Sequence, residues 1–162
     1  AMNCSKLRVL IAVVALLILP GEAPASEFSG SVVSVLDGDT IEVLRSNRAE
    51  RIRLNGIDWV KPWEEGQASY VGLVFGKEVR LQTFGKDKYG RTIADVLLPD
   101  GTNVNHILVK DGWCWWYRKY TPGNVILEEL ERRARGSGLG LWADPTPIPP
   151  WVYRRTTLTE PR

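Results

Sequence analysis

The 162-residue chain is 44% hydrophobic and 25% charged, and its formal net charge at pH 7 is +2. These values are ordinary for one folded domain, and the small net charge excludes a polybasic protein that binds nucleic acids through a global positive field. Any binding of a polyanion must therefore depend on a few locally placed arginines.

The N-terminal segment has the pattern of a secretory signal peptide. Lys6 and Arg8 precede the unbroken apolar run 9–19, and Ala23-Pro24-Ala25 provides the small residues of a cleavage site. The apolar run is short for a membrane span, which needs about 20 residues. We therefore predict that residues 1–25 are removed, that the mature chain is secreted or periplasmic, and that it has no stable membrane association. An uncleaved anchor is the alternative.

The first half of the mature chain predicts a three-stranded meander. Apolar residues alternate with polar ones, although imperfectly, in 28–36, 40–44 and 49–57, which predicts strands. Asp37-Gly38-Asp39 and Ser46-Asn47-Arg48 separate these segments, and Asp-Gly is a strong hairpin signal. Turns about ten residues apart are typical of a small barrel or sandwich.

The second half alternates between predicted strands and short helices. The segments are a helix over 67–75, strands over 78–84 and 91–98, a helix from Thr102 or Asn103 to Asp111, and a helix over 125–135 with Asn124 as its N-cap. Five strands with about three helices predict an α+β, mainly β fold, an OB-type five-stranded barrel whose face commonly binds nucleic acids. We assign this domain to residues 26–143. Residues 144–162 form a proline-rich C-terminal tail, which we expect to run extended along the surface.

Acidic and basic side chains cluster around the predicted meander. Asp39 and Asp58 come at a turn and at the end of an apolar strand, and Arg53 lies between them in the sequence. Carboxylate oxygens suit hard cations such as Ca²⁺ or Mg²⁺, and a guanidinium group matches phosphate oxygens two at a time. The cluster therefore predicts metal-assisted chemistry on a phosphodiester. The alternatives are that the acids only shape a turn and that Arg53 is an exposed strand residue.

Four separate sequence blocks follow one another along the chain. They are Val35-Leu36-Asp37-Gly38-Asp39-Thr40, Arg53-Leu54-Asn55-Gly56-Ile57-Asp58, Asp87-Lys88-Tyr89-Gly90-Arg91 and Gly138-Leu139-Gly140-Leu141-Trp142. In this order they resemble the thermonuclease, or staphylococcal-nuclease-like, family over residues 28–144. Many members of that family are exported, which agrees with the predicted signal peptide.

The resemblance implies an OB-fold endonuclease that uses Ca²⁺ to hydrolyse phosphodiester bonds in DNA and RNA. We further expect a preference for single strands and a monomeric protein. The positions that match the family's site are Asp39 and Asp58 for the metal, Arg53 and Arg91 for the scissile phosphate, and Lys88 and Tyr89 for the substrate. A metal polarises the phosphoryl oxygen, and two guanidinium groups offset the charge that grows on the equatorial oxygens.

The chain departs from the family pattern directly after Asp58. The family continues with a small residue, a proline and a general-base glutamate, whereas this chain has Val60 at the proline position and Lys61 at the glutamate position. A lysine ammonium cannot accept a proton at neutral pH. We predict that Glu64, ahead of Glu65, reaches the attacking water from a bulged loop. If neither does, the alternative is a weak nuclease or a non-catalytic OB-fold module that binds nucleic acid or phosphate.

An aromatic cluster follows the second predicted helix. Trp113, Trp115, Trp116 and Tyr117 either belong to the core, as such clusters usually do, or stack on nucleic-acid bases. Core packing would also bury Cys114, the one cysteine that remains after removal of residues 1–25, so no internal disulfide is expected.

Overall fold

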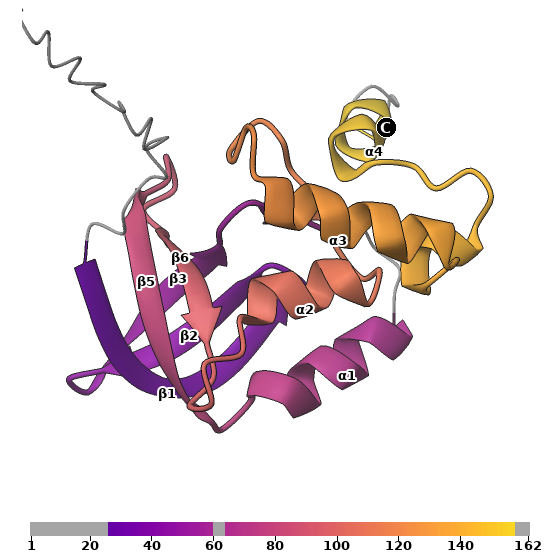
Figure 1. Ribbon diagram of the computed structural model, residues 1–162. Coiled ribbons are helices and arrows are strands. Elements are labelled where there is room, and N and C mark those ends of the chain that lie inside the picture. The colour runs from indigo at the N-terminus through magenta and orange to yellow at the C-terminus, as the bar shows by residue number, and fades with distance from the viewer. Residues whose placement is uncertain (1–25, 60–63, 158–162) are drawn as a thin grey trace, which may run out of the picture.

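The computed structural model describes residues 26–59 and 64–157 (Figure 1). The predicted features that lie outside the described residues are the signal peptide (residues 1–25), Val60, Lys61 and the side chains of Glu64 and Glu65. Within the described ranges, no helix combines the length and the apolar character that a membrane span requires.

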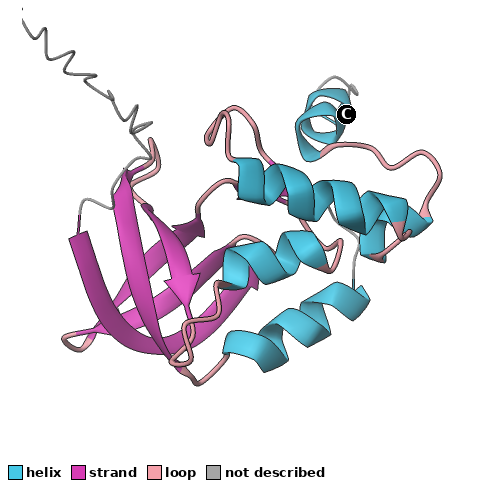
Figure 2. Cartoon of the chain, in the orientation of Figure 1, coloured by secondary structure: helices cyan, strands magenta, loops and turns pink. Residues whose placement is uncertain are grey.

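Five strands close a barrel within the described residues, as the sequence predicts (Figures 1 and 2). In their order around the barrel they are β1 (Ser26–Asp37), β2 (Thr40–Arg45), β3 (Arg48–Leu54), β6 (Thr92–Leu97) and β5 (Glu78–Lys86). Neighbouring strands are antiparallel except β3 and β6, which are parallel. The predicted α+β, mainly β class and OB-type barrel are therefore confirmed.

Alternation along the strands places one set of side chains inside the barrel. In β5, Val79, Leu81 and Thr83 are buried, whereas Glu78 and Arg80 are exposed. Successive side chains of a strand point to opposite faces, so this pattern follows directly from the sequence. It also fixes the strand register, because a slip of one residue would turn the buried set outward.

The helices lie together on one side of the barrel (Figure 2). They are α1 (Glu64–Val74), α2 (Val104–Lys110), α3 (Val125–Gly136), the 3-10 helix η1 (Gly140–Ala143) and α4 (Pro150–Thr157). The predicted N-cap Asn124 is confirmed, and Asn103, predicted only as a possible start of its helix, is the N-cap of α2. The Asn103 side chain accepts a hydrogen bond from the amide of His106 (3.1 Å), and that of Asn124 accepts one from the amide of Leu127 (3.0 Å).

A short pair of strands connects the barrel to the helices. β4 (Ile57–Asp58) pairs antiparallel with β7 (Trp115–Trp116), so that Asp58 lies opposite Trp115. Glu131, a buried residue of α3, accepts a hydrogen bond from the amide of Trp116 at 3.1 Å. Through β7, α3 therefore fixes the strand that carries one of the predicted metal ligands.

The C-terminal tail does not run extended throughout, which corrects the expectation from its prolines. Residues 150–157 form α4, which begins at Pro150. Proline is favoured at the first helical position because its fixed φ suits the helix and its missing N–H would have no partner there. Trp151 ties α4 to the domain through an edge contact with Trp115 (5.6 Å between ring centroids) and a tilted contact with Tyr117 (5.3 Å).

Candidate active site

The β1–β2 hairpin gives two neighbouring acids different tasks. Asp37 accepts a hydrogen bond from the amide of Asp39 at 3.2 Å, which shapes the turn. Asp39 is buried, and its Oδ2 lies 3.2 Å from Nη2 of Arg53. The strand register explains this contact, since Thr40 pairs with Arg53 across β2 and β3. The interpretation as a simple turn residue therefore holds for Asp37 and is wrong for Asp39.

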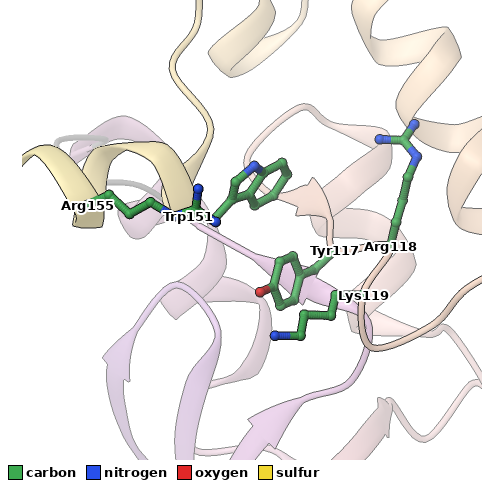
Figure 3. Close-up of a pocket in the computed structure, with 5 residues that line it drawn as sticks. All are labelled: Tyr117, Arg118, Lys119, Trp151 and Arg155. Carbon is green, nitrogen blue, oxygen red and sulfur yellow. The ribbon is translucent and has the colours of Figure 1, made fainter.

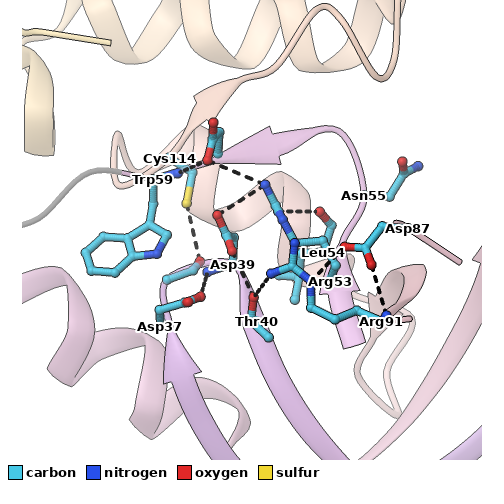
Figure 4. A network of polar contacts seen from close by, with 12 residues as sticks. Asp37, Asp39, Thr40, Arg53, Leu54, Asn55, Trp59, Asp87, Arg91 and Cys114 are labelled. Carbon is cyan, nitrogen blue, oxygen red and sulfur yellow. Dashed lines mark hydrogen bonds and ion pairs between the residues drawn. The ribbon is translucent and has the colours of Figure 1, made fainter. Parts of the chain in front are cut away.

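Arg53 is a buried residue, with a side chain that is 11% exposed. Its Nη2 lies between Asp39 Oδ2 (3.2 Å) and Asp58 Oδ1 (3.5 Å), and its Nη1 donates to the carbonyl of Leu54 (2.9 Å; Figure 4). Among the described residues Arg53 donates two hydrogen bonds, to the carbonyl of Leu54 and to Asp58 Oδ1, so the guanidinium keeps N–H groups that could bind a phosphate. The alternative of an exposed strand charge is wrong.

Gly56 forms the corner that brings Asp58 back to Arg53. Its φ is +71°, and an added Cβ would lie 2.8 Å from Thr121 Oγ1 and 2.9 Å from Leu127 Cδ1. Both the backbone conformation and the close approach therefore favour glycine. Because this corner is tight, β4 starts beside the end of β3.

Arg91 is oriented by two polar side chains. Its Nε donates to Asp87 Oδ2 at 2.7 Å, and its Nη1 donates to the hydroxyl of Thr40 at 3.2 Å. That hydroxyl donates to Asp39 Oδ1 at 3.0 Å and so links Arg91 to Asp39. Burial alone would raise the pKa of Asp87, but hydrogen bonds from Arg91 and the Tyr89 amide hold it below its usual value. Asp87 therefore stays ionised and fixes Arg91.

Both arginines line one pocket of about 400 Å³. Lys88, Tyr89 and Tyr120 line the same pocket. Tyr89 is 73% exposed, and Nζ of Lys88 lies 4.9 Å from the centroid of its ring. The structure thus brings the predicted substrate residues together with the predicted phosphate residues around one open cavity.

The aromatic cluster is divided between the core and the surface. Trp115, Trp116 and Cys114 are buried, and Trp113 packs partly buried against the same core, so core packing is confirmed for these residues. A second pocket, of about 280 Å³, is lined by Tyr117, Arg118, Lys119, Trp151 and Arg155 (Figure 3). Base stacking therefore stays a prediction for Tyr117 alone among the four aromatic residues of the cluster.

The sequence patterns do not reveal Arg154, which the structure places at Asp58. Its Nη1 donates to Asp58 Oδ1 at 3.2 Å, and its Nη2 forms a second, shorter contact with Oδ2. No local signal points to this contact, because it joins α4 to a strand far away in the sequence. Thr40 and Asp87, which hold Arg91, also escaped assignment from sequence, although both belong to the four sequence blocks.

For the predicted general base, Glu64, the structure describes only the backbone. Glu64 is the first residue of α1. Its side chain lies outside the described parts of the chain, and its role as the base stays a prediction.

The carboxylate of Asp39 suits a hard cation. Burial raises the pKa of Asp39 above its usual value; Arg53 lowers it, and Asp37 and Asp58 raise it further. Burial of this carboxylate outweighs its ion pair with Arg53, so an added positive charge would stabilise it, and its oxygens are ligands that Ca²⁺ prefers. In the described ranges no three side chains of Asp, Glu, His or Cys form a ready metal site. The chemistry of Asp39 therefore suits Ca²⁺ even though Asp39 pairs with Arg53, whereas Asp58 pairs with both Arg53 and Arg154.

Comparisons with known proteins agree with the fold. Residues 51–144 match the family model described as staphylococcal nuclease homologue. The chain is 44% identical over 133 residues to a protein of Escherichia coli named an uncharacterized endonuclease, over 80% of this chain and 86% of the relative. It is 40% identical over 170 residues to a micrococcal nuclease of Shigella flexneri, over 94% of this chain and 96% of the relative. The chain therefore belongs to the staphylococcal nuclease family, as its four sequence blocks predict.

Proposed function

We propose that the protein is a Ca²⁺-dependent endonuclease that hydrolyses phosphodiester bonds of DNA and RNA. The nuclease names of its relatives support phosphodiester hydrolysis in general. The observation that carries the proposal is the pair Arg53 and Arg91, which line one open pocket and are linked through Asp39 and Thr40. Two guanidinium forks at one cavity match the oxygens of a phosphodiester.

The two arginines bind the scissile phosphate and oppose the charge that grows on its oxygens as water attacks. Asp87 and Thr40 orient Arg91, while Asp39 and Asp58 orient Arg53. Because the guanidinium groups are held before the substrate arrives, little ordering is needed during the reaction.

Asp39 and Asp58 would hold the Ca²⁺ ion on which this family generally depends. When bound there, the ion supplies a Lewis acid that polarises a phosphoryl oxygen. The charge of Asp39 is less compensated than that of Asp58, because Asp39 pairs with Arg53 whereas Asp58 pairs with both Arg53 and Arg154. Burial also raises the pKa of Asp39. Asp58 would supply its oxygens as metal ligands once one of its paired arginines moves away.

Glu64 is our candidate for the base that accepts a proton from the attacking water. Replacing Glu64 by glutamine, which keeps the size and removes the basic oxygen, should lower kcat by about a hundredfold, a typical value for a lost general base. Glu65→Gln is the matched control, because it changes the next residue in the same way. Single-turnover cleavage of single-stranded DNA measures both. Full activity in Glu64→Gln would refute the assignment, and a loss confined to Glu65→Gln would transfer the role to Glu65.

Three further properties belong to the proposal. Exposed Tyr89 and Tyr120 at the pocket support a preference for single strands, whose unpaired bases can stack on aromatic rings. The sequence of residues 1–25 supports export and a secreted or periplasmic location. We also expect a monomer. Mass spectrometry of the exported protein checks cleavage after Ala25, and an intact N-terminus would contradict export with removal of residues 1–25. Light scattering checks the oligomeric state, and a stable dimer would contradict the monomer.

Cleavage of single-stranded DNA by the purified mature protein tests the central proposal. We expect cleavage in Ca²⁺ and its loss after chelation, with double-stranded DNA and RNA as parallel substrates. Fluorescence anisotropy measures DNA binding under the same conditions. Binding that persists without any Ca²⁺-dependent cleavage would instead support a non-catalytic OB-fold module that binds nucleic acid or phosphate.

A further inference from the structure

The last helix of the described chain reaches into the candidate active site. Arg154 of α4 contacts both oxygens of Asp58, with Nη1 at 3.2 Å from Oδ1 and Nη2 on Oδ2. This is the forked geometry in which an arginine binds a carboxylate most strongly. Asp58 is fully buried, whereas the side chain of Arg154 is 55% exposed. The arginine therefore reaches the buried carboxylate from the protein surface.

The position of α4 depends on the same small sheet that carries Asp58. Trp151, one turn before Arg154, lies against Trp115. Trp115 is the residue of β7 that pairs with Asp58 of β4. Helix α4 is thus connected to Asp58 through Trp151 and Trp115. The packing of Trp151 on Trp115 holds the guanidinium of Arg154 beside Asp58.

Both oxygens of Asp58 accept contacts when Arg154 is in place. Oδ1 lies 3.2 Å from the amide of Trp59, 3.5 Å from Nη2 of Arg53 and 3.2 Å from Nη1 of Arg154, while Oδ2 takes Nη2 of Arg154. Two guanidinium charges face one carboxylate. A divalent cation at Asp58 would need these oxygens and would meet the positive charge of Arg154 at close range.

We infer that Arg154 occupies the cation position at Asp58 and competes there with the divalent metal. The inference rests on the proposed metal site at Asp39 and Asp58. Binding of the metal displaces Arg154 from Asp58 and loosens α4, so the C-terminal helix sets the metal concentration at which the site fills. Arg154 is thus a residue of the active site that acts through Asp58.

Calorimetric titration of the mature chain with Ca²⁺ tests this competition. Arg154→Ala should bind Ca²⁺ at least tenfold more tightly than the unchanged protein. Arg155→Ala is the matched control, because it removes the same charge from the next residue of α4, and its affinity should stay within about threefold, as expected for an exposed charge screened by salt. Arg154→Lys keeps the charge without the fork and should bind with intermediate affinity. Equal or weaker binding by Arg154→Ala than by Arg155→Ala would overturn the inference.

Hydrogen exchange of the unchanged protein gives a second measurement that needs no variant. Saturation with Ca²⁺ should speed exchange of the amides of α4, while those of α3 serve as an internal reference. Unchanged or slower exchange in α4, or no Ca²⁺ binding by the unchanged protein and Arg154→Ala alike, would overturn the inference. A protein that shows the competition but cleaves no nucleic acid would refute the nuclease proposal and leave this one standing.

Discussion

Replacing Arg53 by alanine is expected to lower kcat for cleavage of single-stranded DNA by about a thousandfold or more, since an arginine that offsets transition-state charge is commonly worth about 10³–10⁵ in rate. Arg53 lies between Asp39 and Asp58, so its removal also leaves two buried carboxylates facing each other. Arg53→Lys separates these effects. It keeps the positive charge and loses the fork, and we expect it to stay folded and to lose about a hundredfold in kcat.

Arg51→Ala is the matched control for Arg53. Arg51 belongs to the same strand, but its side chain is 63% exposed and pairs with Glu42 at 3.1 Å on the surface. Its removal should leave kcat unchanged. Single-turnover kinetics measure the loss of kcat. Thermal melting monitored by circular dichroism checks that each variant is folded. Full activity in Arg53→Lys would remove Arg53 from the phosphate site.

Replacing Glu131 by alanine is expected to lower the free energy of unfolding by about 2–4 kcal/mol, because the buried amide of Trp116 loses its acceptor and a cavity remains. Glu131 also pairs with Arg118 and Arg135, each at 3.3 Å. Both arginines are half exposed and can turn to water, so the orphaned amide dominates the loss. Urea denaturation followed by tryptophan fluorescence measures the change.

Glu129→Ala on the same helix is the control for Glu131. Glu129 pairs with Arg132 and Arg133 on the exposed face of α3, where ion pairs contribute little. We expect no measurable loss. Glu131→Gln should recover part of the stability, since its amide oxygen still accepts from Trp116. Equal losses in Glu129→Ala and Glu131→Ala would contradict the buried network as the cause.

The barrel could be predicted because its signals are local. The alternation in residues 78–84 shows which side chains of β5 face inward, and Asp37-Gly38-Asp39 marks the first hairpin. The roles expected for Asp39 and Arg53 depend on one more step, the pairing of Thr40 with Arg53. The register of the β2–β3 hairpin determines this pairing, so the arrangement of Asp39 and Arg53 follows from sequence signals that are close together in the chain.

The contacts of α4 could not be predicted because they are tertiary. Prolines at 145, 147, 149 and 150 indicate an extended chain, and a helix that starts at Pro150 is stabilised only when Trp151 and Arg154 find their partners. Trp115 and Asp58 lie far earlier in the sequence. No periodicity within the tail encodes that docking, since isolated helices of this length are marginal in water.

The parallel pairing of β3 with β6 determines when the site comes into existence during folding. Arg53 of β3 lies opposite Ile93 of β6, and Arg91 directly precedes β6. The β1–β2–β3 meander can form from local contacts, whereas we expect β3 to meet β6 later, because this pairing, like that of β1 with β5, joins strands far apart in the sequence. A chain that has made all of its hairpins therefore still holds its two arginines apart. If the proposed function is correct, the phosphate site forms only when β3 pairs with β6, and a partly folded chain is expected not to cleave nucleic acid.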